Sequence, residues 1–149
     1  MGKRNEDSSR RATRGLCIGV TTLGLLVSVP VAVGQELPVF RKGLWEFNRS
    51  IDSGSGKPQS VATKQCVNPS DDMKKQNEML TRAGCTFSPV ARSGNAYSFS
   101  SQCRIQGVSA QSKSVMHADG DSAYRIEVES QQGQVKTRET LVAKRVGDC

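Results

Sequence analysis

Four cysteines are the residues of this sequence with the clearest chemistry, and they stand far apart: Cys66, Cys85, Cys103 and Cys149. Zinc sites usually contain close pairs such as Cys-x-x-Cys, and the four cysteines form no such pair. Widely spaced cysteines in even number are typical of disulfides formed in an oxidising compartment. The spacing therefore predicts two disulfide bonds and no metal site.

His117 is the only histidine in the chain. A catalytic triad or a multi-histidine metal site therefore cannot be built in the usual way, and a single strand histidine is more often a surface side chain. The segment Asp119-Gly120-Asp121-Ser122 supplies too few oxygen ligands for a calcium loop. Because Asp and Gly tolerate left-handed backbone, a tight hairpin turn explains this segment better.

Neighbouring acidic residues at Asp71 and Asp72 do not form a catalytic pair, since adjacent helical side chains point in different directions. The sequence also lacks a phosphate-binding glycine loop, a nucleophile elbow and a dinucleotide-binding fingerprint. We therefore predict that the protein is not an enzyme and has no catalytic residues, metal site or cofactor.

Alternation of polar and apolar residues predicts that strands position these side chains. The first predicted strand runs from Gly43 to Asp52, with Trp45, Phe47 and Ile51 on one face. Further strands are expected over residues 61–67, 86–92, 97–105, 108–118, 124–128 and 135–146. Short strands at regular spacing predict a curved or partly closed antiparallel meander. The expected fold is mainly β with one helix (α+β), stapled by disulfides.

One helix is expected to interrupt the strands. Asn68 is suited to cap it, Pro69 to its first position, and Asp71 and Asp72 to the positive end of its dipole. Gly84 can end the helix in a left-handed conformation. We expect its buried side to be formed by four residues: Met73, Met79, Leu80 and Ala83.

An export signal is expected over residues 1–34, followed by a single domain over residues 35–149. The chain opens with five basic side chains, carries no charge from Leu16 to Gly34, and has small residues just before Gln35. This order is typical of a secretory signal peptide. Cleavage would also remove Cys17 and leave an even number of cysteines. A retained anchor and a twin-arginine signal at Ser9-Arg10-Arg11 are the alternatives.

The charge of the predicted mature domain is modest, because residues 35–149 hold sixteen basic and twelve acidic side chains. The basic residues are scattered and have few aromatic neighbours, whereas a nucleic-acid groove has a basic stripe with stacking rings. We therefore expect no nucleic-acid partner. No second apolar run follows the signal, so we expect no stable membrane span after its cleavage.

Disulfide pairing is predicted from the expected arrangement of the elements. Cys66 precedes the helix and Cys85 follows it, so a bond between them would clamp both helix ends. A bond from Cys103 to Cys149 would hold a terminus that otherwise frays, and it would close the longer loop. We therefore predict the pairs Cys66–Cys85 and Cys103–Cys149.

Several short motifs occur in the order that one known family has them: Gly43-Leu44-Trp45-Glu46-Phe47, Cys66 before the Pro-led helix, Cys85, Ser93-Gly94-Asn95, Cys103 and Lys144-Arg145-Val146-Gly147-Asp148-Cys149. With these, the chain resembles the exported bacterial proteins catalogued as domain of unknown function 3617. The resemblance covers nearly all of the predicted mature domain. It implies a periplasmic location and four cysteines, and it implies no activity.

Three functions remain open at this point. The one we favour is a non-catalytic periplasmic protein that binds a small apolar or lipid-like ligand, or an envelope partner, on the concave face of its sheet. The second is a structural or inhibitory module that pairs with another protein through a sheet edge. The third is a hydrolase that uses carboxylates or His117. A large enclosed apolar pocket would favour the ligand-binding protein. A long exposed edge strand would favour the interaction module, and carboxylates converging on His117 would favour the hydrolase.

Overall fold

Nine elements follow one another in a computed structural model that describes residues 36–54 and 56–149. The expected signal peptide over residues 1–34 lies outside the described residues. The elements are β1 (Gly43–Asp52), β2 (Gln59–Val67), α1 (Pro69–Arg82), β3 (Cys85–Phe87), β4 (Ala91–Ser93), β5 (Ala96–Ile105), β6 (Val108–Asp119), β7 (Ala123–Gln132) and β8 (Val135–Gly147). The prediction of a mainly β fold with one helix is confirmed.

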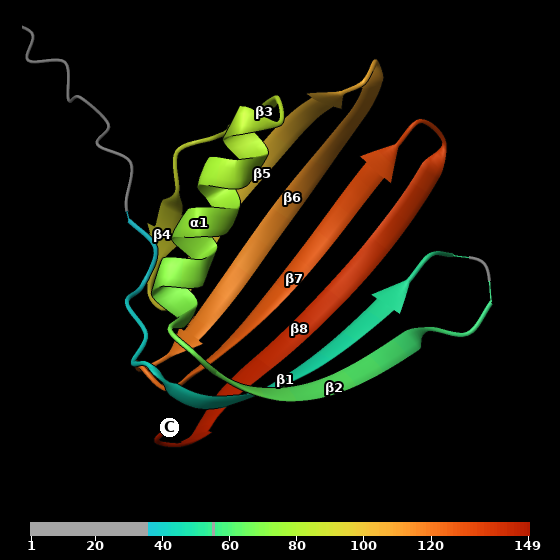
Figure 1. Cartoon of the computed structure of the whole chain (residues 1–149). Helices are drawn as coiled ribbons and strands as arrows, with labels where there is room; N and C mark the ends of the chain where they lie inside the picture. Colours follow the sequence, from blue (N-terminus) through green and yellow to red (C-terminus); the bar gives the residue numbers. More distant parts are fainter. Residues whose placement is uncertain (1–35, 55) are drawn as a thin grey trace, which may run out of the picture. The chain divides into compact units, whose positions relative to one another are not determined.

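All strands form one open antiparallel sheet in the order β2-β1-β8-β7-β6-β5-β3, with β4 also paired to β5. Strands β5 to β8 make a meander, and the β1–β2 hairpin joins it at β8 (Figure 1). One edge of the sheet is therefore β2 and the other is β3 with β4. Helix α1 carries the chain from the first edge to the second.

One face of the sheet, the inner face, holds the core. Trp45, Tyr97, Met116, Tyr124 and Ala143 come from five different strands and are all buried there. Their alternation matches the period of two that the sequence predicts. The opposite, outer face carries the charged residues between them, including Arg125, Glu127 and Lys144, which are exposed.

Helix α1 begins and ends where the sequence predicts. Pro69 follows the N-cap residue Asn68, although the Asn68 side chain donates to Asp71 (2.7 Å) instead of capping the helix. Past its end, Gly84 has a φ of +99°, and a Cβ there would lie 2.7 Å from the Arg104 carbonyl oxygen. That close approach leaves room only for glycine.

The predicted buried side of the helix is wrong in part. Met73 and Leu80 are half-buried, but Met79 is 61% exposed and Ala83 is also exposed. Met73 packs against the core cluster of the inner face, and Figure 1 shows the helix on the side of the sheet nearest the β3 edge. It thus buries only a narrow stripe. Among the described residues, no helix is long and apolar enough to cross a membrane.

A single strand over residues 86–92 was expected, and this is wrong. The chain forms two short strands, β3 and β4, separated by Ser88, Pro89 and Val90. Pro89 has no backbone N–H and cannot continue a ladder. Next to it, the Ser88 hydroxyl accepts the N–H of Ser100 (3.0 Å) in place of a backbone carbonyl. The edge of the sheet is therefore broken at this point.

The predicted disulfide pairing is also wrong. The bonds are Cys66–Cys149, with Cα atoms 5.8 Å apart, and Cys85–Cys103, with Cα atoms 3.9 Å apart. Cys85 and Cys103 lie directly opposite each other on β3 and β5. Cys66 and Gly147 flank Leu44 from either side, so Cys149 reaches Cys66 across β1. The prediction failed because it did not foresee β1 lying between β2 and β8.

Candidate functional site

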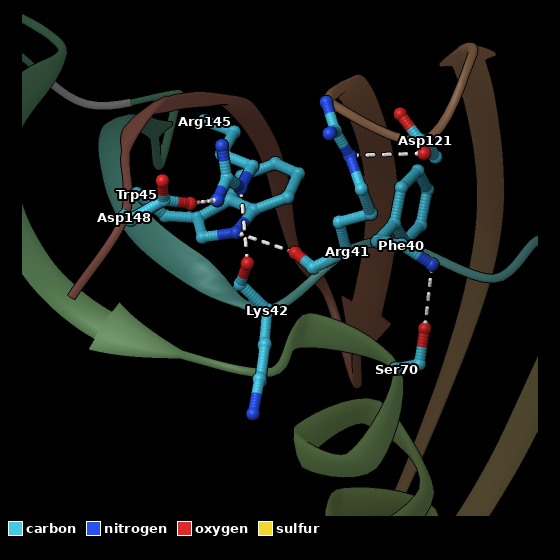
Figure 2. A network of polar contacts seen from close by, with 8 residues as sticks. All are labelled: Phe40, Arg41, Lys42, Trp45, Ser70, Asp121, Arg145 and Asp148. Carbon is cyan, nitrogen blue, oxygen red and sulfur yellow. Dashed lines mark hydrogen bonds and ion pairs between the residues drawn. The ribbon is translucent and has the colours of Figure 1, made fainter.

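Arg145 is the centre of a polar network at one end of the inner face, near the start of β1. Its Nε donates to the carbonyl oxygen of Lys42 (2.9 Å), and its guanidinium pairs with Asp148 (Figure 2). Gly43 leaves space for this side chain, because a Cβ at Gly43 would stand 2.5 Å from Arg145 Nε. The start of β1 and the end of β8 are thereby locked together.

Trp45 lies beside this network and anchors the aromatic part of the core. It is fully buried, and its indole Nε1 donates to the carbonyl oxygen of Arg41 (3.0 Å). The Phe40 ring lies 6.0 Å from the Trp45 ring and 4.6 Å from the Tyr124 ring. Burial, and secondarily the nearby Asp72, raises the pKa of Tyr124 to about 12. This phenol therefore keeps its proton near neutral pH.

Residues 36–42, the strap, connect the helix to this end of the sheet. Phe40 donates its backbone N–H to the hydroxyl of Ser70 at the start of α1 (2.8 Å). Arg41 bonds through its backbone N–H to the carbonyl oxygen of Asp121 (2.9 Å), and its side chain pairs with the Asp121 carboxylate (3.0 Å). Figure 2 shows these contacts around Phe40 and Arg41. We call this region the closed end. It consists of the strap, helix α1, the start of β1 and the end of β8.

At the closed end, the segments that carry the family resemblance come together in space. Gly43 and Trp45 belong to the first motif, and Arg145 and Asp148 belong to the last. Trp45 fills the core, Gly43 makes room for the Arg145 side chain, and Arg145 bonds to backbone and pairs with Asp148. The first and last motifs therefore join the start of β1 to the end of β8.

The other half of the inner face, the open half, has a different composition. Its first cross-strand row contains Met116, Ile126 and Leu141, and the next contains Phe99, Val128 and Glu139. Except for the buried Met116, these six residues are half-buried. Figure 1 shows this part of the sheet extending beyond the helix. The concave surface thus shields these side chains only partly from water.

A third row on the open half has only hydroxyl side chains on β5 to β8, and Phe87 of β3 lies next to it, opposite Ser101. The register places Ser101 opposite Ser112, Ser112 opposite Ser130, and Ser130 opposite Thr137, across β5 to β8. We call these four residues the hydroxyl row. All are half-buried, and the hydroxyl oxygens of Ser101 and Ser112 lie 2.8 Å apart. Neighbouring strands are about 4.8 Å apart, so the row offers donors and acceptors at a regular interval.

A groove with a volume of about 620 Å³ lies over the backbone of this row, and most of its lining side chains belong to the outer face, including Gln111, Lys113 and Gln131. Asp52, at the end of β1, and Gly54, in the turn that follows, also contribute to its wall. Arg138 in its lining pairs with Glu129 (2.7 Å), whereas on the inner face Arg49 pairs with Glu139 (2.9 Å). The groove is therefore open and polar, and it lies on the face opposite the half-buried apolar side chains. It is not the enclosed apolar pocket that would favour a wholly apolar ligand.

The residues singled out from the sequence for chemistry are not brought together. His117 is exposed on the outer face opposite Arg125. Asp119 and Asp121 flank a hairpin turn, and Asp71 and Asp72 lie at the start of α1. Within residues 36–54 and 56–149, no three His, Cys, Asp or Glu side chains are grouped as metal ligands. The four cysteines are all bonded in pairs.

The fold and its covalent links define the class of this protein. It is a small antiparallel β-sheet domain with two disulfides, which indicate a non-cytoplasmic environment. The chain belongs to the family described as protein of unknown function (DUF3617), whose model matches residues 40–149. No curated protein and no solved structure matches it. The resemblance inferred from the motifs is therefore confirmed.

Proposed function

We propose that this chain is a periplasmic, non-catalytic binding protein that holds a small lipid-like molecule on the open half of its inner face. The observation that carries the proposal is the hydroxyl row, which lies on the inner face beside the row that contains the half-buried Phe99 and Val128. A surface of this kind suits an amphiphile, because an apolar chain and a polar head each find matching groups.

The head group that fits best is uncharged and rich in hydroxyl or carbonyl oxygens. Serine and threonine hydroxyls can both donate and accept hydrogen bonds. Arg49, the basic residue on the inner face near the row, already has a carboxylate partner in Glu139. A charged head group would have to compete with this ion pair or lose its own hydration. We therefore propose a glyceride-like ligand, with its acyl chain beside Phe99, Val128 and Leu141.

The binding test compares a monoacylglycerol with the fatty acid of the same chain length, using titration calorimetry below micelle-forming concentrations. We expect the monoacylglycerol to bind more tightly. Replacing both Ser112 and Ser130 by alanine should weaken its binding about tenfold, since each hydrogen bond contributes about 0.5–1.5 kcal/mol. Ser109→Ala, on the outer face of the same strand, is the matched control and should change nothing.

Loss of the apolar contacts tests the other half of the proposal. Leu141→Ser should weaken binding of both ligands, whereas Val142→Ser, one residue along and on the outer face, should not. The proposed function is wrong if neither ligand binds. It is also wrong if the Ser112/Ser130 double variant and Leu141→Ser both bind the ligands as tightly as the original chain does.

Periplasmic location is the second part of the proposal. Its support is the basic and then uncharged opening of the sequence, together with the two disulfides. N-terminal sequencing of the protein recovered from the periplasm should begin at or near Gln35. A mature chain that retained residues 16–34 would contradict signal cleavage and favour the anchor.

A further inference from the structure

We propose that two copies of this chain pair through strand β2, in antiparallel orientation about a twofold axis at Thr63, so that their sheets become continuous. This inference does not depend on the proposed ligand. It starts from the unequal protection of the two sheet edges. An unpaired edge presents a row of backbone N–H and carbonyl groups that can pair with another strand.

The β3–β4 edge is protected against pairing. Its two strands have three residues each, and Pro89 lies in the gap between them. Figure 1 shows helix α1 over this side of the sheet. Short strands, proline and a covering element are the devices that natural proteins use to prevent edge-to-edge association.

The β2 edge has almost none of these devices. β2 is nine residues long, contains no proline and pairs with β1 without a register shift. All its residues except Val67 are exposed, including Val61 at 59%. Its one charged residue, Lys64, is paired with Glu46 of the neighbouring strand (3.0 Å). A long regular strand with one partly neutralised charge is an edge that accepts a partner.

The sequence of β2 favours a second copy as that partner. Pairing all nine residues about Thr63 places Val61 opposite Gln65 and Ala62 opposite Lys64 of the other copy. No like charges then face each other directly, and each Lys64 stays beside its own Glu46. The contact is isologous, with the same strand used on both sides, as a twofold dimer requires.

The test uses the twofold axis itself, on purified protein with both disulfides formed. Sedimentation equilibrium over a concentration series should show a monomer–dimer equilibrium. Thr63→Lys places two lysines face to face at the axis and should raise the dissociation constant at least about tenfold. Thr63→Glu should do the same. Thr86→Lys, the matched substitution on the protected edge, should leave the dimer unchanged.

Variants with opposite charges at position 63 test the register in which the two β2 strands pair. An equimolar mixture of the Thr63→Lys and Thr63→Glu variants should form a heterodimer, because opposite charges then meet at the axis. Circular dichroism on each variant alone checks that the fold is retained, and Thr63 is exposed, so we expect no change. The proposal is wrong if the original protein is strictly monomeric. It is also wrong if Thr63→Lys and Thr63→Glu each still form the dimer alone, or if their mixture stays monomeric.

Discussion

The closed end and the open half lie on the same face of the same sheet, yet they differ in how far their side chains are buried and in what those side chains bond to. At the closed end, Trp45 is fully buried and the backbone of the strap bonds to both the helix and the sheet. On the open half, Ser112 and Ser130 are half-buried and lie in a row of hydroxyl side chains. We infer from this difference that the closed end supplies most of the stability of the domain. Side chains on the open half can therefore differ with little effect on that stability.

Each end has its own disulfide, and removing them should give the largest effects. Cys66–Cys149 closes a loop of 83 residues at the closed end, and Cys85–Cys103 closes one of 18 at the open half. The chain-entropy argument gives losses of about 4.5 and about 3 kcal/mol, respectively. Urea unfolding of the double Cys→Ser variants measures both. Equal losses would contradict the comparison.

The strap should be nearly as important as the first disulfide. Phe40→Ala removes a ring that is 2% exposed and packs against Trp45 and Tyr124. We expect a loss of about 3–5 kcal/mol in the free energy of unfolding, because the space cannot refill. Val39→Ala, at a side chain that is 79% exposed, is the control and should change stability by less than about 0.5 kcal/mol. A small effect of Phe40→Ala would mean that the strap is dispensable.

Alkaline pH should weaken the closed end through Tyr124. The pKa of its phenol is raised to about 12 in the folded protein, whereas an unfolded tyrosine titrates near 10. The folded state therefore holds this proton more tightly, and stability falls as the pH rises from about 10 to about 12. Tyr124→Phe should flatten the loss over this interval when unfolding is followed against pH. An unchanged slope in that variant would assign the loss to other groups.

A matched pair of serine substitutions gives the smallest and most direct test of the comparison. Ser70 at the closed end accepts the Phe40 N–H (2.8 Å), so Ser70→Ala should cost about 1 kcal/mol. Ser130 on the open half is half-buried in the hydroxyl row, and Ser130→Ala should stay within about 0.5 kcal/mol. Thermal unfolding of the two variants measures the difference. The reverse order would locate structural hydrogen bonding in the hydroxyl row.

Much of the fold is readable from the sequence because local signals agree with it. The strand from Gly43 to Asp52 follows from its alternation, and α1 follows from Pro69 and Gly84. The misplaced features depend on distant parts of the chain. Met79 is exposed because α1 buries only a narrow stripe, and Cys66 pairs with Cys149 because β1 lies between their strands.

The hydroxyl row could not be predicted from the sequence by the same reasoning. Ser101, Ser112, Ser130 and Thr137 lie on four strands, and each is an ordinary polar residue in its own strand. Only the register of three consecutive pairings places them in one row. Alternation does assign each of them to the inner face, so a serine or threonine where an apolar residue is expected is the signal that was available.

The pairing of β1 with β8 has a consequence for the order in which the domain can form. Lys42 and Arg145, which bond across this junction, are 103 positions apart. The β1–β2 hairpin therefore has no sheet to join until β8 has been made, and the meander of β5 to β8 has to come first. Such non-local pairings are slow to form, because closing a long loop costs conformational entropy before any contact compensates for that loss. We expect folding to finish only when the chain has emerged as far as β8, and the Cys66–Cys149 bond to be the later of the two to close.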